Sequence, residues 1–480
     1  METKKLAGLE PGSVFGYFEE ICAIPHGSRN TKAVSDYVVD FAKAHGLRYV
    51  QDEMNNVIVY GPGTCGLENH PTVILQGHLD MVCEKDSDCP IDMATQGLDV
   101  THDGQFVFAK GTTLGGDDGI AIAMGLALLA DPTIPHPPVE LVCTTEEEIG
   151  LLGADAMDMS VLQGRTMINL DSEAEGIFTV SCAGGCTATI ELPVERRAVY
   201  GPCIRLSVDG LQGGHSGADI HRKRANANKV MGEFLSRIQK LMPLCLTSFT
   251  GGSKGNAIPR SCRVNLVAMG IQLERINEIA QTLQKEIRAE YDEPEAVIQA
   301  FDVDALGGNS LTTESTAKVI SLLCSAPNGV QKWSADIAGL VQTSLNLGIA
   351  KLGDRFSATF SVRSSVNAEK KELLEQLRAL AGMLDGTYSQ DGEYPAWEYR
   401  EESHLRDTMV PIYRELFGAE PRVEAIHAGL ECGLFSERLS GLDCVSIGPD
   451  ILDIHTSRER LDIASVQRTW RFLLEVLKNL

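Results

Sequence analysis

The strongest constraint on the fold is an alternation of buried strands and helices in which each strand ends at polar residues. Residues 55–63, 70–78, 137–148 and 166–176 have the apolar, β-branched character of buried strands. A run of small apolar residues at 119–131 indicates a buried helix between the second and third of them. Sheets built in this way bind ligands at the carboxyl ends of their strands. The pattern therefore predicts an α/β fold with its functional site at that edge.

A second pattern occupies residues 187–398. Its first half reads strand, helix, strand, strand, helix, strand, at 201–210, 226–241, 246–252, 262–270, 276–291 and 295–303. A looser version follows, with helices at 314–327 and 368–384, strands at 343–353 and 356–365, and a last strand near 396–399. After about residue 400 the α/β pattern returns. We therefore expect an α/β domain made of residues 1–186 and 399–480, and an inserted α+β lid domain, 187–398, that contains a doubled βαββαβ unit.

The charge balance argues against two classes of partner. The 480 residues include 66 acidic and 42 basic side chains, for a formal net charge of −24, which does not attract nucleic acid or anionic membranes. No segment has the roughly 18 consecutive apolar residues of a membrane helix, and the N-terminus lacks the apolar core of a signal peptide. Thirteen cysteines without C-x-x-C spacing are typical of reduced thiols. We expect a cytoplasmic protein.

The stretch GTTLGGDDGIAIA, residues 111–123, places two adjacent aspartates at the start of the expected helix. A glycine-rich loop before a helix usually indicates a phosphate site, because backbone N–H groups and the helix dipole attract anions there. Asp117 and Asp118 would repel a phosphate, and no lysine follows the glycines. Carboxylates on a rigid turn suit a cation instead. Taken alone, the pair is also compatible with a helix N-cap.

Other strand ends carry side chains of the same kind. They are His78 and Asp80 in LQGHLDMV, Glu146, Glu147 and Glu148 in TTEEEIG, Asp171 in NLDSEAEG, and His455 in GPDILDIHTSRE. Imidazole with carboxylate is the ligand set of Zn²⁺ and similar ions. Carboxylates gathered at one sheet edge repel one another unless cations neutralise them. A single histidine or aspartate at a strand end is more often a surface or cap residue. The convergence of several such residues on one sheet edge, however, predicts a metal site.

With these motifs the chain resembles the metallopeptidase family that includes carboxypeptidase G, the aminoacylases and the carnosinases. The matching stretches lie between residues 22 and 455 and are CAIPHGS, LQGHLDMVCEK, GTTLGGDDGIAIAM, TTEEEIGLLGA, NLDSEAEG, GGHSGADIH, NANK, GNAIPR, HAGLECGLF and SIGP. The resemblance implies a mixed-sheet, zinc-peptidase-like catalytic domain. It also implies hydrolysis of dipeptides, of the Xaa-His type and more broadly, by a water that two divalent ions activate. Zn²⁺ is the expected ion, with Mn²⁺ or Co²⁺ as alternatives.

The resemblance also implies roles for individual residues. Its metal ligands map to His78 and Asp171 for one ion, Glu148 and His455 for the other, and Asp117 for both. Asp80 would orient His78, as its place behind the imidazole in H-x-D also suggests, and Asp118 would merely follow Asp117. In the run TEEE, counting back from IGLLGA selects Glu147 as the general base and Glu148 as the ligand.

Three residues of the expected lid complete the implied site. His215 in GGHSG would donate to the oxyanion, and Asn256 and Arg363 would hold the substrate backbone, with Arg363 suited to a free carboxylate. Simple relatives borrow this histidine from a dimer partner through a lid of about half this size. Because the lid is doubled here, one chain could supply all of these groups, and a homodimer remains an open alternative. Arg363 is equally compatible with a surface charge.

Several other interpretations remain open at this stage. GHSGA, residues 214–218, resembles a serine-hydrolase nucleophile elbow centred on Ser216, and a non-catalytic binding protein could share the fold. Within the same chemistry, a carboxypeptidase, a tripeptidase or an N-acyl amino acid deacylase differs only in its substrate pocket. His427 and Glu431 are compatible either with the site or with simple burial.

Overall fold

The computed structural model describes residues 4–267, 270, 272–303 and 307–480. The chain divides into two compact units. The first contains residues 1–181, 399–425 and 430–480, and the second contains residues 182–398 and 426–429. The predicted ranges 1–186, 187–398 and 399–480 differ from this division at residues 182–186 and at 426–429, which belong to the second unit.

The core of the first unit is an eight-stranded sheet in the order β1-β2-β6-β3-β7-β23-β8-β22. In that order the strands are Arg48–Gln51, Val57–Gly61, Val139–Thr144, Val73–His78, Thr166–Asn169, Asp443–Ser446, Ile177–Cys182 and Arg422–Ile426. Strands β6, β3, β7 and β23 run parallel, whereas β1, β2 and β8 pair antiparallel. The sheet is mixed, as expected, and every residue of β3 and β6 is buried.

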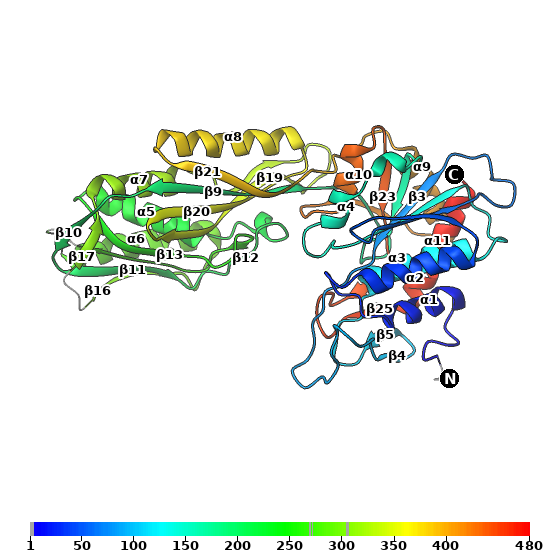
Figure 1. Ribbon diagram of the computed structural model, residues 1–480. Coiled ribbons are helices and arrows are strands. Elements are labelled where there is room, and N and C mark those ends of the chain that lie inside the picture. The colour runs from blue at the N-terminus through cyan, green and yellow to red at the C-terminus, as the bar shows by residue number, and fades with distance from the viewer. Residues whose placement is uncertain (1–3, 268–269, 271, 304–306) are drawn as a thin grey trace. The chain divides into compact units, whose positions relative to one another are not determined.

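Helices and a small sheet surround this core. The helices are α1 (Gly12–Cys22), α2 (Lys32–Ala44), α3 (Gly116–Ala130), α4 (Leu152–Ala156), α9 (His404–Phe417), α10 (Cys432–Arg438) and α11 (Ile463–Lys478). The small sheet has the order β24-β25-β5-β4, with β24 at Ile451–Leu452, β25 at Arg460–Asp462, β5 at Phe106–Ala109 and β4 at Val100–His102. Helix α3 packs against α1 and β3 (Figure 1), which brings its N-terminus to the carboxyl end of β3.

The second unit contains a nine-stranded sheet. Its main order is β16-β11-β15-β13-β19-β20-β9-β21, and β18 pairs with β19. The strands are Val297–Val303, Cys203–Asp209, Cys262–Val267, Cys245–Gly251, Val341–Leu352, Arg355–Ser364, Gly184–Pro193 and Thr387–Tyr394 in that order, with β18 at Gly329–Trp333. Two short pairs join β10 (Arg196–Tyr200) to β17 (Gly307–Leu311) and β12 (Gly214–His215) to β14 (Ala257–Ile258).

Four helices cover one face of this sheet. They are α5 (Ala227–Gln239), α6 (Leu273–Tyr291), α7 (Thr313–Ser325) and α8 (Asn367–Met383), and α8 lies along β9 and β21 (Figure 1). Buried residues alternate along β20, and its inward side chains share one apolar cluster with side chains of all four helices. One-sided burial of this kind is typical of an α+β layer.

The topology confirms the doubled βαββαβ unit. The first copy is β11-α5-β13-β15-α6-β16 and the second is β9-α7-β19-β20-α8-β21. When the four strands of each copy are numbered along the chain, both copies place them side by side in the order fourth, first, third, second. The two copies meet where β13 pairs with β19. The expected last strand near 396–399 is wrong, because the strand is Thr387–Tyr394. Most of its residues are exposed, so it lacks the apolar alternation that marks a strand.

Candidate metal centre

His78 ends strand β3 with its imidazole held in one orientation. Its Nδ1 atom donates to the main-chain oxygen of Asp80 at 2.8 Å, so in the neutral ring Nε2 is the nitrogen that can bind a metal. That Nε2 atom lies 3.0 Å from Asp117 Oδ1 and 3.7 Å from Asp171 Oδ1. Asp171 comes two residues after β7, the parallel neighbour of β3. Adjacent strand ends therefore bring these groups together.

The other half of the centre joins the start of α3 to the loop after β24. Asp117 Oδ2 lies 3.2 Å from His455 Nε2, and the same nitrogen lies 2.9 Å from Glu148 Oε1. His455 has a left-handed backbone, with φ of 60°. Asp117 thus faces one imidazole with each of its two oxygens, the arrangement required of a carboxylate that bridges two ions.

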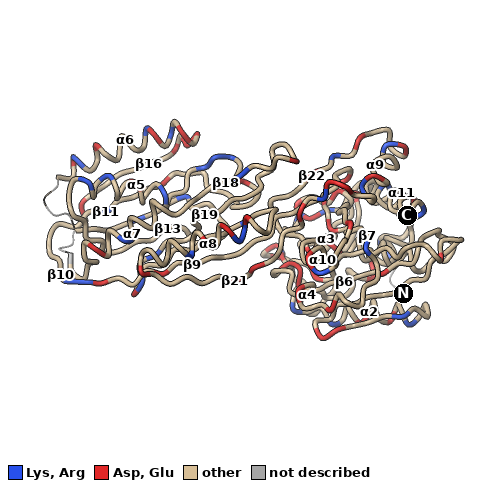
Figure 2. The backbone as a smooth tube through the Cα atoms, turned by 90° about the horizontal axis from the view of Figure 1, so that it is seen from above, with Lys and Arg blue, Asp and Glu red and all other residues tan. Residues whose placement is uncertain are grey.

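Three groups within the described residues can each offer metal-ligand atoms less than 4.8 Å apart. They are Asp117 with Glu148 and His455, His78 with Asp118 and Asp171, and His78 with Glu147 and Glu148. The structure therefore brings together all five predicted ligands. Acidic segments, red in Figure 2, lie near α3, α4 and α10 of this unit.

The electrostatics of the cluster indicate that it is built for cations. Burial, together with the charges of Glu431 and Glu148, raises the pKa of Glu147 to about 8. Burial likewise holds the pKa of Asp171 well above its usual range, with a contribution from Asp118. The hydrogen bonds of Asp117 and Glu148 raise the pKa of the His455 imidazole to about 10. Divalent ions would relieve this crowding of buried carboxylates, so the residues fit a metal pair.

Asp80 acts on the site differently from the expected arrangement. Its main-chain oxygen, not its carboxylate, accepts the His78 N–H, and Asp80 Oδ1 is 3.6 Å from that nitrogen. The carboxylate accepts the N–H of Glu147 at 3.0 Å, the N–H of Glu148 at 3.4 Å and the hydroxyl of Ser28 at 2.8 Å. Asp80 therefore orients the turn that carries the expected base and ligand.

Two further acidic residues have contacts that the sequence did not reveal. Asp118 does more than follow Asp117: its side chain is buried, and its Oδ2 atom accepts the backbone N–H of His78 at 3.1 Å. Glu146 accepts the N–H of Arg29 at 2.7 Å and so fastens the loop before α2. Only the folded backbone shows where these N–H groups point, so no local sequence signal could have identified either contact.

A buried polar layer lies on the strands that carry the ligands. Gln76 precedes His78 by two residues on β3, and it donates to Glu431 Oε2 at 2.6 Å and accepts from Asn169 on β7 at 2.6 Å. The Thr144 hydroxyl at the end of β6 also donates to Glu431 at 2.6 Å. Glu431 is fully buried, and burial raises its pKa to about 7. Glu431 thus cross-links strands β3 and β6 within the first unit.

The second unit gathers His215, Asn256 and Arg363 around one loop. The Asn256 main-chain oxygen accepts the N–H of Ser216 at 2.8 Å. A Cβ atom placed on Gly217 would lie 3.2 Å from His215 Cε1 and 3.3 Å from Arg363 Nε, so these two side chains flank the glycine. The structure thus brings together the three residues that the sequence assigned to the lid.

The ring of His215 has a defined hydrogen-bonding pattern. Its Nδ1 atom accepts the backbone N–H groups of Gly217 at 3.3 Å and Ala218 at 3.1 Å. Burial and the Arg363 charge lower its pKa, so the ring is neutral at pH 7 and Nε2 bears the proton. Arg363 donates through Nη1 to the Tyr394 hydroxyl at 3.2 Å, and His427 contacts the Ser344 hydroxyl through Nε2 at 2.7 Å. His427 therefore belongs to the second unit, not to the metal cluster.

The serine-hydrolase interpretation of Ser216 does not match the structure. Ser216 is buried, follows a strand of only two residues and precedes a turn and a short 3-10 helix, not the long strand and helix of a nucleophile elbow.

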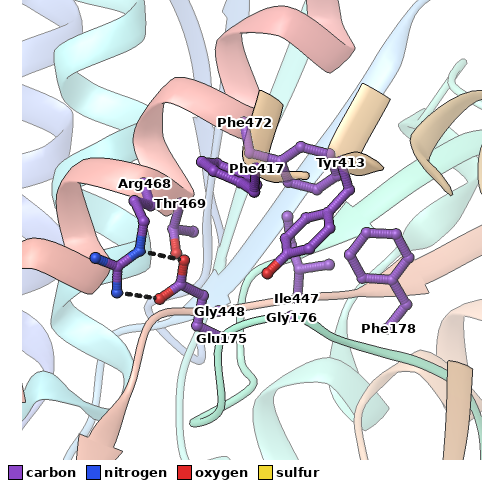
Figure 3. A pocket seen from close by; sticks show the side chains of 10 residues that line it. All are labelled: Glu175, Gly176, Phe178, Tyr413, Phe417, Ile447, Gly448, Arg468, Thr469 and Phe472. Atoms are coloured by element: carbon purple, nitrogen blue, oxygen red, sulfur yellow. Dashed lines mark hydrogen bonds and ion pairs between the residues drawn. The ribbon is translucent and has the colours of Figure 1, made fainter. Parts of the chain in front are cut away.

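A separate small cavity of about 10 Å³ lies in the first unit. It is lined by aromatic rings and by the Glu175–Arg468 ion pair at 2.6 Å (Figure 3), and none of the predicted site residues line it.

Comparisons with known proteins agree with this geometry. Residues 206–295 match the family model described as a peptidase dimerisation domain of M20 peptidases. The chain is 35% identical to the cytosol non-specific dipeptidase of Escherichia coli over 99% of both chains. Its structure is similar to that of aminoacylhistidine dipeptidase from Vibrio alginolyticus, with a TM-score of 0.93 and 33% identity over 100% of this chain and 98% of the other. Aminopeptidase PepT of Bacillus cereus shares the fold at a TM-score of 0.56 and 14% identity. The protein therefore belongs to the M20 family of metallopeptidases, together with the cytosol non-specific dipeptidase of Escherichia coli.

Proposed function

We propose that the protein is a dipeptidase that hydrolyses its substrates with two divalent metal ions. The observation that carries the proposal is the pair of imidazoles, His78 and His455, that face opposite oxygens of Asp117 at 3.0 and 3.2 Å. Two relatives, a cytosol non-specific dipeptidase and an aminoacylhistidine dipeptidase, support dipeptides as the substrate class. We further propose a preference that includes Xaa-His dipeptides.

The first unit would hold the ions. His78 and Asp171 would bind one ion, Glu148 and His455 the other, and Asp117 both. When bound, such a pair lowers the pKa of a water molecule and stabilises negative charge on the scissile carbonyl oxygen. We propose Zn²⁺ as the working ion, because two imidazoles with carboxylates suit it, and Mn²⁺ or Co²⁺ as substitutes.

Glu147 would transfer the proton in the reaction. Its backbone N–H is held by the Asp80 carboxylate, and its own carboxylate lies within 4.8 Å of ligand atoms of His78 and Glu148. Glu147 would take a proton from the attacking water and deliver it to the leaving amine. Glu146 would take no part in this step, because its carboxylate accepts the backbone N–H of Arg29.

The second unit would bind the substrate. His215 is neutral with its proton on Nε2, the form that can donate a hydrogen bond to the oxyanion. Arg363 would grip the free carboxylate of the dipeptide through its planar fork, and Asn256 would contact the substrate backbone.

We propose that one chain provides all of these groups. Strand β13 of the first copy already pairs with β19 of the second within the same chain. Because residues 206–295 match a dimerisation domain, we also propose that two chains can form a homodimer through other surfaces. Light scattering of the purified protein tests this.

In the described residues, no helix is long and apolar enough to cross a membrane. We propose a cytoplasmic location on the basis of the relative's name.

An assay with a matched set of substrates tests the function. The metal-stripped protein, reconstituted with Zn²⁺, Mn²⁺ or Co²⁺, is given a free dipeptide such as β-alanyl-histidine, its N-acetylated form, its amide and a tripeptide. We expect cleavage of the free dipeptide alone. Cleavage of the tripeptide or the N-acetylated substrate would instead indicate a tripeptidase, a carboxypeptidase or a deacylase. Absence of bound metal would indicate a non-catalytic binding protein.

A further inference from the structure

The glycine-rich loop before α3 does bind an anion, and the anion comes from the protein itself. The carboxylate of Glu459 accepts four consecutive backbone N–H groups of this loop. The distances are 2.9 Å from Leu114, 3.3 Å from Gly115, 2.8 Å from Gly116 and 3.5 Å from Asp117. Glu459 is only 3% exposed. A ring of amide groups at a helix N-terminus is an anion-binding device, and here a side chain occupies it.

The backbone of the loop is shaped for this contact. Gly115 has a φ of 68°, in the left-handed region, which turns successive N–H groups toward the same side. A Cβ atom on Gly115 would lie 2.9 Å from Met81 Sδ, and one on Gly116 would lie 3.2 Å from Glu459 Oε1. Glycine is therefore favoured at Gly115 by the left-handed backbone, and a side chain on Gly116 would crowd the Glu459 carboxylate.

Glu459 connects the two parts of the chain that carry the second ion's proposed ligands. It follows His455 by four residues, and the loop that it holds ends at Asp117. Those two side chains meet at 3.2 Å between His455 Nε2 and Asp117 Oδ2. Hydrogen bonds to a charged carboxylate are among the strongest in proteins. One buried carboxylate thus fastens the loop of one ligand to the segment of the other.

We propose that Glu459 is a positioning residue of the metal centre, which holds Asp117 at the distance from His455 that allows both to share an ion. The proposal rests on the proposed metal-dependent function. Asp117 would bind both ions, but Glu459 holds both Asp117 and the segment of His455, whereas the His78 imidazole is oriented by the Asp80 main chain. The proposal therefore predicts that a change at Glu459 weakens binding of the ion held by Asp117, Glu148 and His455 more than binding of the ion held by Asp117, His78 and Asp171.

The test compares Glu459→Gln with a matched control, Glu140→Gln. Glu140 is also buried in the first unit and accepts backbone N–H groups, those of Gln163 at 2.9 Å and Gly164 at 3.0 Å, but it holds a loop without ligands. Zn²⁺ affinity is measured by titration calorimetry on the full chain, and the visible absorption of the Co²⁺ form reports the ligand geometry. Circular dichroism and the melting temperature of the metal-free proteins report folding.

We expect Glu459→Gln to lower the affinity for one of the two ions about 10- to 100-fold and to change the Co²⁺ spectrum. Glu140→Gln should change the affinity less than twofold. An unchanged affinity in Glu459→Gln, or an equal loss in both variants, would overturn the proposal. If Glu459→Gln does not fold, Glu459→Asp gives the same measurement, and wild-type affinity in that variant would also overturn it. If the wild-type protein binds no pair of ions, the proposed function fails, which is a different outcome.

Discussion

The Nδ1 atom of His78 donates to the main-chain oxygen of Asp80 at 2.8 Å, while the Asp80 carboxylate accepts the N–H of Glu147 at 3.0 Å. Asp80 therefore acts through two different groups: its backbone sets the tautomer of one proposed ligand, and its side chain holds the proposed base. This division explains why an H-x-D motif can serve both the metal and the proton transfer.

The position of Glu147 predicts that Glu147→Gln lowers kcat by about 100- to 10 000-fold and leaves two ions bound, because the amide cannot accept a proton. Metal content by elemental analysis and turnover of a free dipeptide check this. Glu146→Gln is the control, since that carboxylate binds the Arg29 backbone at 2.7 Å, and it should keep kcat within a few-fold. Loss of an ion in Glu147→Gln would show that the order of ligand and base is shifted by one residue.

The Asp80 contacts predict that Asp80→Asn lowers kcat about 10- to 100-fold with little change in KM. The amide of asparagine can keep only part of the hydrogen bonds to Glu147, Glu148 and Ser28. Ser28→Ala removes one of these partners and should have a smaller effect. A larger loss in Ser28→Ala than in Asp80→Asn would contradict the assignment.

Removal of metal by a chelator is expected to abolish activity, and Zn²⁺, Mn²⁺ or Co²⁺ is expected to restore it. Ser216→Ala should keep activity within a few-fold, because the Ser216 side chain donates to the Ser361 hydroxyl at 3.3 Å and not to a proposed catalytic group among the described residues. Activity that survives chelation but not Ser216→Ala would favour a serine nucleophile.

The geometry of Arg363 predicts that Arg363→Lys raises KM for free dipeptides about 10- to 100-fold, because lysine cannot grip both oxygens of a carboxylate. Arg355→Lys on the same strand β20 is the matched control, since its guanidinium contacts Glu191 at 3.4 Å. Steady-state kinetics with the free dipeptide and its amide distinguish a contact with the substrate carboxylate from a general effect of the substitution. Equal KM changes in both variants would argue against a specific role of Arg363.

The pKa of Glu431 predicts a pH dependence of stability in the metal-free protein. Burial raises this pKa from 4.5 to about 7, so the native state holds a proton that the unfolded chain has already lost. Between these pH values the native state binds more protons than the unfolded state, and stability must fall as the pH rises, by up to about 3 kcal/mol. Urea unfolding at pH 5 and pH 8 measures the fall. Glu431→Gln, which keeps acceptors for Gln76 and Thr144, should show a smaller fall, and an identical fall would contradict the prediction.

The sequence by itself determined the fold class, and it predicted the side chains that the structure brings together as proposed metal ligands. Parallel strands place their carboxyl ends at one edge, so His78, Asp171 and the run Glu146–Glu148 could be expected to lie close together from the strand pattern alone. The choice of Glu148 as the ligand came from the family resemblance. The first βαββαβ copy was predictable for a related reason, because its strands and helices carry regular apolar periodicity. The last strand, Thr387–Tyr394, was not, because it is an exposed edge strand without that signal.

Tertiary structure alone decided how those residues are held. The carboxylate of Glu459 meets backbone N–H groups more than 340 residues away in sequence, and Asp118 meets the N–H of His78 across 40 residues. The contacts of Asp80 likewise depend on the direction of individual N–H and C=O groups. Sequence patterns record which side chains are apolar or charged, but the direction of a backbone amide is set only when distant segments pack together.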